Sequence, residues 1–197
     1  AISTVLMTTE VKKDLQEELI ELLKQKADED NPTATFVCGT MYLYGEVFPK
    51  DIEKGVHYLK ISADKNNPSG LLIYGNCFRE GNGVKKDTKK AFEYFKKAHE
   101  LNNEEAMKNI AQMITNNEIT NIDDEKIKFI KESAYSGIPD ALDAYKYLLK
   151  NNKSLLVELQ KEAENGNINA MRTYGYCFKF DDAITSKRYL QAAIDKG

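Results

Sequence analysis

The chain has 197 residues, of which 42% are hydrophobic and 30% are charged, and its formal net charge at pH 7 is -3. This balance is typical of a soluble globular protein and gives no basic excess of the kind that attracts nucleic acid or an anionic membrane. Arginine, the usual reader of phosphate groups, occurs only as Arg79, Arg172 and Arg188. No apolar run reaches the roughly 20 residues of a transmembrane helix, so we expect neither a nucleic-acid partner nor a membrane span.

The N-terminal region, residues 1–32, predicts one helix over residues 10–28. Its apolar residues recur at helical spacing and form the stripe Val11, Leu15, Leu19, Leu22 and Leu23. The positions between them are mostly charged, which is typical of a solvated outer face. We expect this helix either to cap the array that follows or to complete a preceding repeat.

From residue 33 onward the sequence repeats itself with a period near 36 residues. Asp51 recurs as Asp87 36 positions later, and Gly39 recurs as Gly75 at the same offset. A fixed period of this length is typical of helical repeat architectures. We place five repeats at residues 33–67, 68–103, 104–138, 139–167 and 168–197.

The first helix of the second repeat is expected to begin at Asn67 and Pro68, because Asn is a good N-cap and Pro suits the first helical position. Its packing face is predicted to contain Leu71, Tyr74, Gly75 and Phe78. A glycine in the middle of a helix costs about 1 kcal/mol relative to alanine. We therefore expect Gly75 to permit the close approach of a neighbouring helix.

A turn and a second helix complete the repeat. Gly81 and Gly83, with Gly45 at the position of Gly81 in repeat one, are expected to end the first helix and turn the chain, and Asp51 and Asp87 to cap the second helix. Ala91 and Ala98 lie on the apolar face of that second helix. Such a helix pair cannot bury its apolar face alone, whereas stacked pairs can. We therefore predict an all-α fold, a right-handed α-α superhelix of stacked helix–turn–helix units.

The later repeats depart from this pattern. The third repeat keeps the period but loses the loop glycines, and the fourth has a shortened loop and no small residue at the glycine position. The fifth regains the helical glycine as Gly175.

These motifs resemble the Sel-1-like repeat, a branch of the tetratricopeptide-type helical repeats. The second repeat matches the pattern in register at Gly75, Phe78, Gly81, Gly83, Val84, Asp87, Lys90, Ala91, Tyr94, Lys97 and Ala98. The resemblance covers roughly residues 33–197 and is strongest over 33–102. It implies an adaptor that gathers protein partners, by analogy of fold.

The residues that could carry chemistry form no recognisable catalytic, cofactor or metal site. Cys38, Cys77 and Cys177 lack the spacing of a disulfide or zinc framework, so we expect buried, reduced thiols. His57 and His99 stand alone, without the converging ligands that a metal needs. We expect no catalytic residue, no cofactor and no metal.

Partner-binding residues are expected on the exposed face of the first helices, which line the concave surface of tetratricopeptide-type arrays. The register predicts the set Phe36, Thr40, Leu43, Tyr44, Leu72, Asn76, Arg79, Glu80, Lys108 and Gln112. Exposed apolar clusters often mark interaction sites. The alternative is that the apolar members are buried against neighbouring repeats or the N-terminal helix.

We therefore expect a non-catalytic scaffold that binds a peptide or helix of a partner protein. The second hypothesis is a regulatory or targeting region of a larger enzyme or signalling protein, suggested by the missing initiator Met and the ending at residue 197. A third is a hydrolase that uses Cys or His. The free cysteines favour a cytoplasmic location, with the secretory lumen as the alternative.

Overall fold

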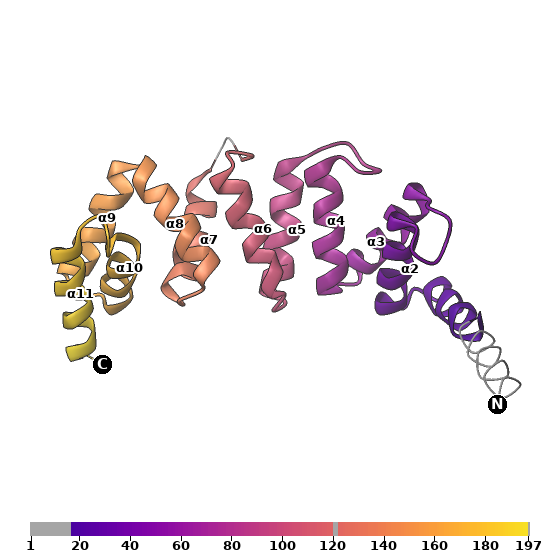
Figure 1. The fold of residues 1–197 in the computed structure, drawn as a ribbon, viewed down its shortest axis with the longest axis horizontal. Coiled ribbons are helices and arrows are strands. Elements are labelled where there is room, and N and C mark those ends of the chain that lie inside the picture. The colour runs from indigo at the N-terminus through magenta and orange to yellow at the C-terminus, as the bar shows by residue number, and fades with distance from the viewer. Residues whose placement is uncertain (1–16, 120–121, 197) are drawn as a thin grey trace, which may run out of the picture. The chain divides into compact units, whose positions relative to one another are not determined.

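The computed structural model describes residues 17–119 and 122–196, and all the regular structure in these ranges is helical (Figure 1). The all-α prediction is confirmed. The chain divides into two compact units, one up to residue 106 and the other from residue 107. None of the described helices has the length and apolar character that crossing a membrane requires.

The first unit contains two helix pairs. They are α2 (Pro32–Tyr44) with α3 (Ile52–Asp64) and α4 (Pro68–Glu80) with α5 (Thr88–Glu100). The helices of each pair pack against each other, and α3 also packs against α4. Each pair falls within one of the first two predicted repeats, apart from Pro32, which begins α2 one position early.

The repeated polar and glycine positions fix where these helices begin and end. The side chain of Asn67 accepts a 2.9 Å hydrogen bond from the backbone N–H three residues later. Asp51 and Asp87 each accept an equivalent bond of 3.0 Å. Gly45 and Gly81 follow α2 and α4 with φ of 75° and 79°, a left-handed conformation that favours glycine. The predicted caps are confirmed.

The glycines inside the first helices lie against the second helix of the same repeat. A Cβ atom added at Gly75 would lie 2.7 Å from a ring carbon of Phe95, and one added at Gly39 would lie 2.8 Å from Leu59. Neither position has room for a side chain. The close approach that the sequence predicts is therefore confirmed.

The N-terminal helix packs through a face that only partly matches the predicted apolar stripe, since Leu23 is packed as expected. Its residues 17–28 contact α2 and the following loop through Ile20, Leu23 and Ala27. Leu19 and Leu22, which were expected in the apolar stripe, are exposed. The stripe was wrong at these positions because the spacing of leucines alone does not show which side α2 covers. Val11 and Leu15 lie outside the described residues.

The second unit continues with three helix pairs; the division at residue 106 falls in the first turn of α6. The pairs are α6 (Glu104–Thr115) with α7 (Asp124–Tyr135), α8 (Pro139–Asn151) with α9 (Lys153–Glu164), and α10 (Ile168–Phe178) with α11 (Ala183–Lys196). Asn152 alone separates α8 from α9 and caps α9 by accepting a 3.1 Å bond from Leu155 N. Each pair falls within one of the last three predicted repeats.

The interior of this unit is formed by large side chains with no exposed surface, among them Ile130, Tyr145 and Leu159. Helix α10 is central to it, since it packs against α7, α8, α9 and α11. Gly175 on α10 lies against Leu190 of α11, where an added Cβ would overlap the leucine side chain. The helical glycine thus has the same role as in the first two repeats.

Candidate partner-binding surfaces

The predicted partner-binding set is partly exposed. Tyr44 and Glu80 are open to solvent, and so are Lys108 and Gln112. The partly exposed members are Phe36, Thr40, Asn76 and Arg79. Contact of these residues with a partner stays a prediction.

Two apolar members of that set are not on the surface. Leu43 is 2% exposed and Leu72 is 5% exposed. Leu43 lies where α2 passes close to α3, since a Cβ at Gly55 would be 3.0 Å from the Leu43 Cα. Leu72 belongs to α4, which packs against both α3 and α5. For these two leucines, burial in the array was the correct alternative.

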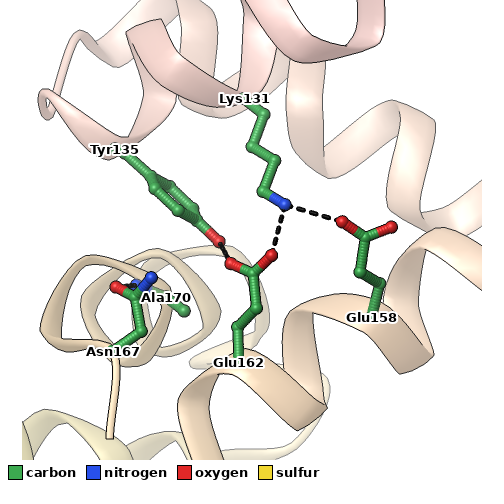
Figure 2. A network of polar contacts seen from close by, with 6 residues as sticks. All are labelled: Lys131, Tyr135, Glu158, Glu162, Asn167 and Ala170. Carbon is green, nitrogen blue, oxygen red and sulfur yellow. Dashed lines mark hydrogen bonds and ion pairs between the residues drawn. The ribbon is translucent and has the colours of Figure 1, made fainter. Parts of the chain in front are cut away.

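The second unit has a groove of about 660 Å³ between α7 and α9. Its lining residues are Asp124, Ile127, Lys128, Lys131, Glu132, Tyr135, Asn152, Ser154, Leu155, Glu158, Glu162 and Asn167. Figure 2 shows the polar network in it: Lys131 from one side reaches Glu158 and Glu162 on the other, and Tyr135 also points to Glu162. The Lys131 Nζ lies 2.8 Å from a Glu158 carboxylate oxygen.

The protonation states of the network follow from its geometry. Burial raises the pKa of Glu162, but the hydrogen bonds from Lys131 and Tyr135 outweigh it and lower the pKa overall. Burial lowers the pKa of Lys131, yet the two glutamates raise it overall. Burial and the bond to Glu162 both raise the pKa of Tyr135. The groove therefore holds a charged lysine between two carboxylates, and these groups satisfy one another.

A second pocket of about 360 Å³ lies beside α8 and α10, which are the first helices of the fourth and fifth repeats. It is lined by Tyr135, Gly137, Pro139, Leu142, Arg172, Thr173, Gly175, Tyr176, Lys179 and Leu190. Arg172 and Lys179 are the charged members of this lining, which includes no carboxylate. The pocket thus combines apolar side chains with two cations, Arg172 on α10 and Lys179 directly after it.

Aromatic side chains accompany these cations. Tyr176 is 40% exposed, and Phe180, just after α10, is 84% exposed. The Lys179 Nζ lies 5.3 Å from the ring centre of Tyr176 and 5.0 Å from that of Phe180. We call Arg172, Tyr176, Lys179 and Phe180 the α10 strip.

Sequence reasoning missed the α10 strip although the signal was present. Its residues stand at the same positions relative to Gly175 as Leu72, Asn76, Arg79 and Glu80 do relative to Gly75. The register was applied to the first three repeats and not carried to the fifth. Applying it there identifies all four residues.

The cysteines and histidines do not converge on a reactive site in the described part of the chain. Cys38, Cys77 and Cys177 are buried free thiols, as expected. Burial raises the pKa of Cys77 to about 11 and that of Cys177 to about 12, so both stay protonated at neutral pH. Burial also lowers the pKa of His99. Among residues 17–119 and 122–196, no three His, Cys, Asp or Glu side chains gather as metal ligands.

Comparison with known families and structures relates this geometry to other proteins. Residues 32–67 and 68–103 each match the family model of the Sel1 repeat. The comparison with curated protein sequences gave no match.

Two solved structures have a similar fold. A Sel1 repeat protein from Oxalobacter formigenes is 24% identical with a TM-score of 0.53, covering 91% of this chain and 79% of its own. A protective antigen of uropathogenic Escherichia coli, which displays an SLR fold, is 21% identical with a TM-score of 0.58, covering 90% of this chain. The present chain spans 41% of the length of that antigen.

Proposed function

Because this chain is a Sel1-like repeat (SLR) protein, we propose that it is a protein-interaction module whose first helices bind a peptide or helix of a partner. The observation that carries this proposal is the α10 strip beside a pocket of about 360 Å³. Protein interfaces are enriched in Tyr, Phe and Arg. A pocket of this volume also accommodates one or two side chains of a partner.

The α7–α9 groove is larger, yet its charges favour a structural role. Lys131 and Glu162 already have partners within the groove, and a ligand would have to replace bonds that exist. Losing such bonds offsets most of what a new contact gains. The pocket beside the α10 strip has no carboxylate in its lining that could pair with Arg172 or Lys179. The exposed rings of Tyr176 and Phe180 also gain from burial against a partner.

Site-specific photocrosslinking in the cells that produce the protein tests this function. Benzoylphenylalanine placed at Tyr176 should yield a covalent adduct with a defined protein, identified by mass spectrometry. The same group placed at Glu164, an exposed residue at the end of α9, serves as the control and should not yield it. Absence of a protein adduct at Tyr176, or equal adducts at both positions, would contradict the proposal.

A further inference from the structure

We propose that the α8–α10 pocket binds an acidic peptide segment, whose carboxylates pair with Arg172 and Lys179 and whose apolar side chain packs on Tyr176 and Phe180. This inference rests on the proposed function and names the class of partner. The lining of the pocket provides two cations, four aromatic or large aliphatic side chains and no carboxylate: Arg172, Lys179, Tyr135, Leu142, Tyr176 and Leu190.

The two carboxylates that follow the α10 strip in the sequence, Asp181 and Asp182, are already engaged elsewhere. Asp181 lies 3.7 Å from the Lys146 ammonium and 3.3 Å from that of Lys150. Asp182 accepts hydrogen bonds from the Tyr174 hydroxyl at 3.0 Å and from Thr185 N at 3.2 Å. The bonds from Thr185 and Tyr174 lower the pKa of Asp182, so it stays ionised in this role. Neither aspartate is committed to Arg172 or Lys179.

Helix α8 adds charges of both signs to the surroundings. Lys146 and Lys150 on this helix are bound to Asp181 and cancel its charge. Asp143 is exposed on the same helix but does not line the pocket. The pocket itself therefore keeps the positive character that Arg172 and Lys179 give it.

The spacing on α10 fits an extended ligand. Arg172 and Lys179 are seven positions apart, which corresponds to roughly 10 Å along a helix. An extended peptide covers this distance in about three residues. Tyr176 lies between the two cations in the sequence, and all three residues line the pocket. Because alternate side chains of an extended peptide share one face, the ligand is expected to have two acidic residues four positions apart, with an apolar residue midway between them.

Lys179 contacts two aromatic rings, and a carboxylate of a ligand can replace this contact. Its ammonium group lies over the rings of Tyr176 and Phe180 at 5.3 and 5.0 Å, in solvent-exposed surroundings. A cation–π contact is weak at an exposed site, whereas a charge-assisted hydrogen bond to a carboxylate is stronger. In the α7–α9 groove, by contrast, an acidic peptide would meet four carboxylates. They are Asp124, Glu132, Glu158 and Glu162.

Selection from a phage-displayed library of random twelve-residue peptides tests the inference on the full chain. Binders should be enriched in Asp and Glu around an apolar residue, and synthetic peptides made from them should bind with an affinity that falls as salt rises. The double variant Arg172→Gln/Lys179→Gln should weaken their binding at least tenfold. The matched control Lys153→Gln/Lys161→Gln removes two exposed lysines of α9 and should bind as the wild type does. Circular dichroism melting of each variant checks that it folds.

The outcomes separate this inference from the proposed function. Binders without acidic enrichment, or acidic binders that the Arg172→Gln/Lys179→Gln variant holds equally well, would overturn the acidic partner and leave peptide binding standing. A library that yields no binder contradicts both. The inference would also be overturned if a single-stranded DNA oligonucleotide of equal net charge bound as tightly as the peptide. Binding would then depend on charge alone.

Discussion

Two tyrosines of the second unit differ in what their hydroxyl groups contact. Replacing each by phenylalanine therefore removes a hydroxyl group from two different environments. The Tyr135 hydroxyl donates a hydrogen bond to Glu162, whereas the fully buried Tyr145 hydroxyl has no partner among the described residues. A bond to a charged group stabilises a protein by about 1.5–3 kcal/mol, less where water competes, and an unpaired buried hydroxyl costs about 1–3 kcal/mol.

We therefore expect Tyr135→Phe to destabilise the protein by about 1 kcal/mol or more, and Tyr145→Phe to leave it unchanged or more stable. Urea unfolding, followed by circular dichroism, measures both free energies. Each variant controls for the other, since both remove one oxygen atom and keep the ring. Equal losses in the two variants would show that the bond from Tyr135 to Glu162 does not contribute to stability.

The same network predicts a dependence of stability on pH. The pKa of Glu162 is lowered in the folded protein through its bonds to Lys131 and Tyr135. A carboxyl of this kind adds stability above its unfolded pKa, about 4.3, and loses it as the pH falls through the folded pKa. We expect Glu162→Gln to lower the melting temperature near pH 7 and to have a much smaller effect near pH 3. A difference that stays constant across this range would rule out the charged network as its source.

At the scale of helices, α2 and α3 meet through their backbones in the first repeat. A Cβ atom at Gly55 would lie 2.8 Å from Leu43 N and 3.0 Å from the Gly39 carbonyl oxygen. Alanine in place of Gly55 gains about 1 kcal/mol of helix propensity. The overlap with backbone atoms that cannot rotate away costs about 1–3 kcal/mol or more. We expect Gly55→Ala to destabilise the protein in thermal melting, whereas His57→Ala, at an exposed position of α3, should not. A rise in stability for Gly55→Ala would contradict this account of the helix contact.

The helices themselves were largely predictable from local chemistry. Asn67 and Asp87 cap helices where the sequence places them, and Gly81 ends α4, because these effects depend on a few adjacent residues. The buried face of the N-terminal helix was not predictable in the same way. Ile20 and Ala27 pack against α2 while Leu19 is exposed. Hydrophobicity gives an apolar stripe, but only the position of the neighbouring helix decides which edge of it is covered.

At the scale of the molecule, the exposed residues of the candidate surface also depend on how neighbouring helices pack, which the sequence pattern does not show. The register predicts a packing face and an opposite face for each first helix, and it leads to Tyr176 and Lys179 when applied to the fifth repeat. It fails at Leu43 and Leu72, which lie at the same kind of position but are covered. Whether such a position is open depends on how the neighbouring helices pack, α3 for Leu43 and both α3 and α5 for Leu72, and the register of one helix does not show this packing.

The division into two compact units predicts that a destabilising substitution mainly affects the unit that contains it. In a repeat array each unit contacts only its neighbours, so stability is close to a sum of local terms. Leu159 on α9 is fully buried, and Leu159→Ala should cost about 2–5 kcal/mol in the second unit. Hydrogen exchange followed by mass spectrometry should then show faster exchange in α7 to α11 and unchanged exchange in α3 and α4. The matched variant Leu59→Ala, at a fully buried position of α3, should give the reverse pattern. Faster exchange of all helices in both variants would mean that the two units unfold as one, because a loss of packing in either would then reach the whole chain.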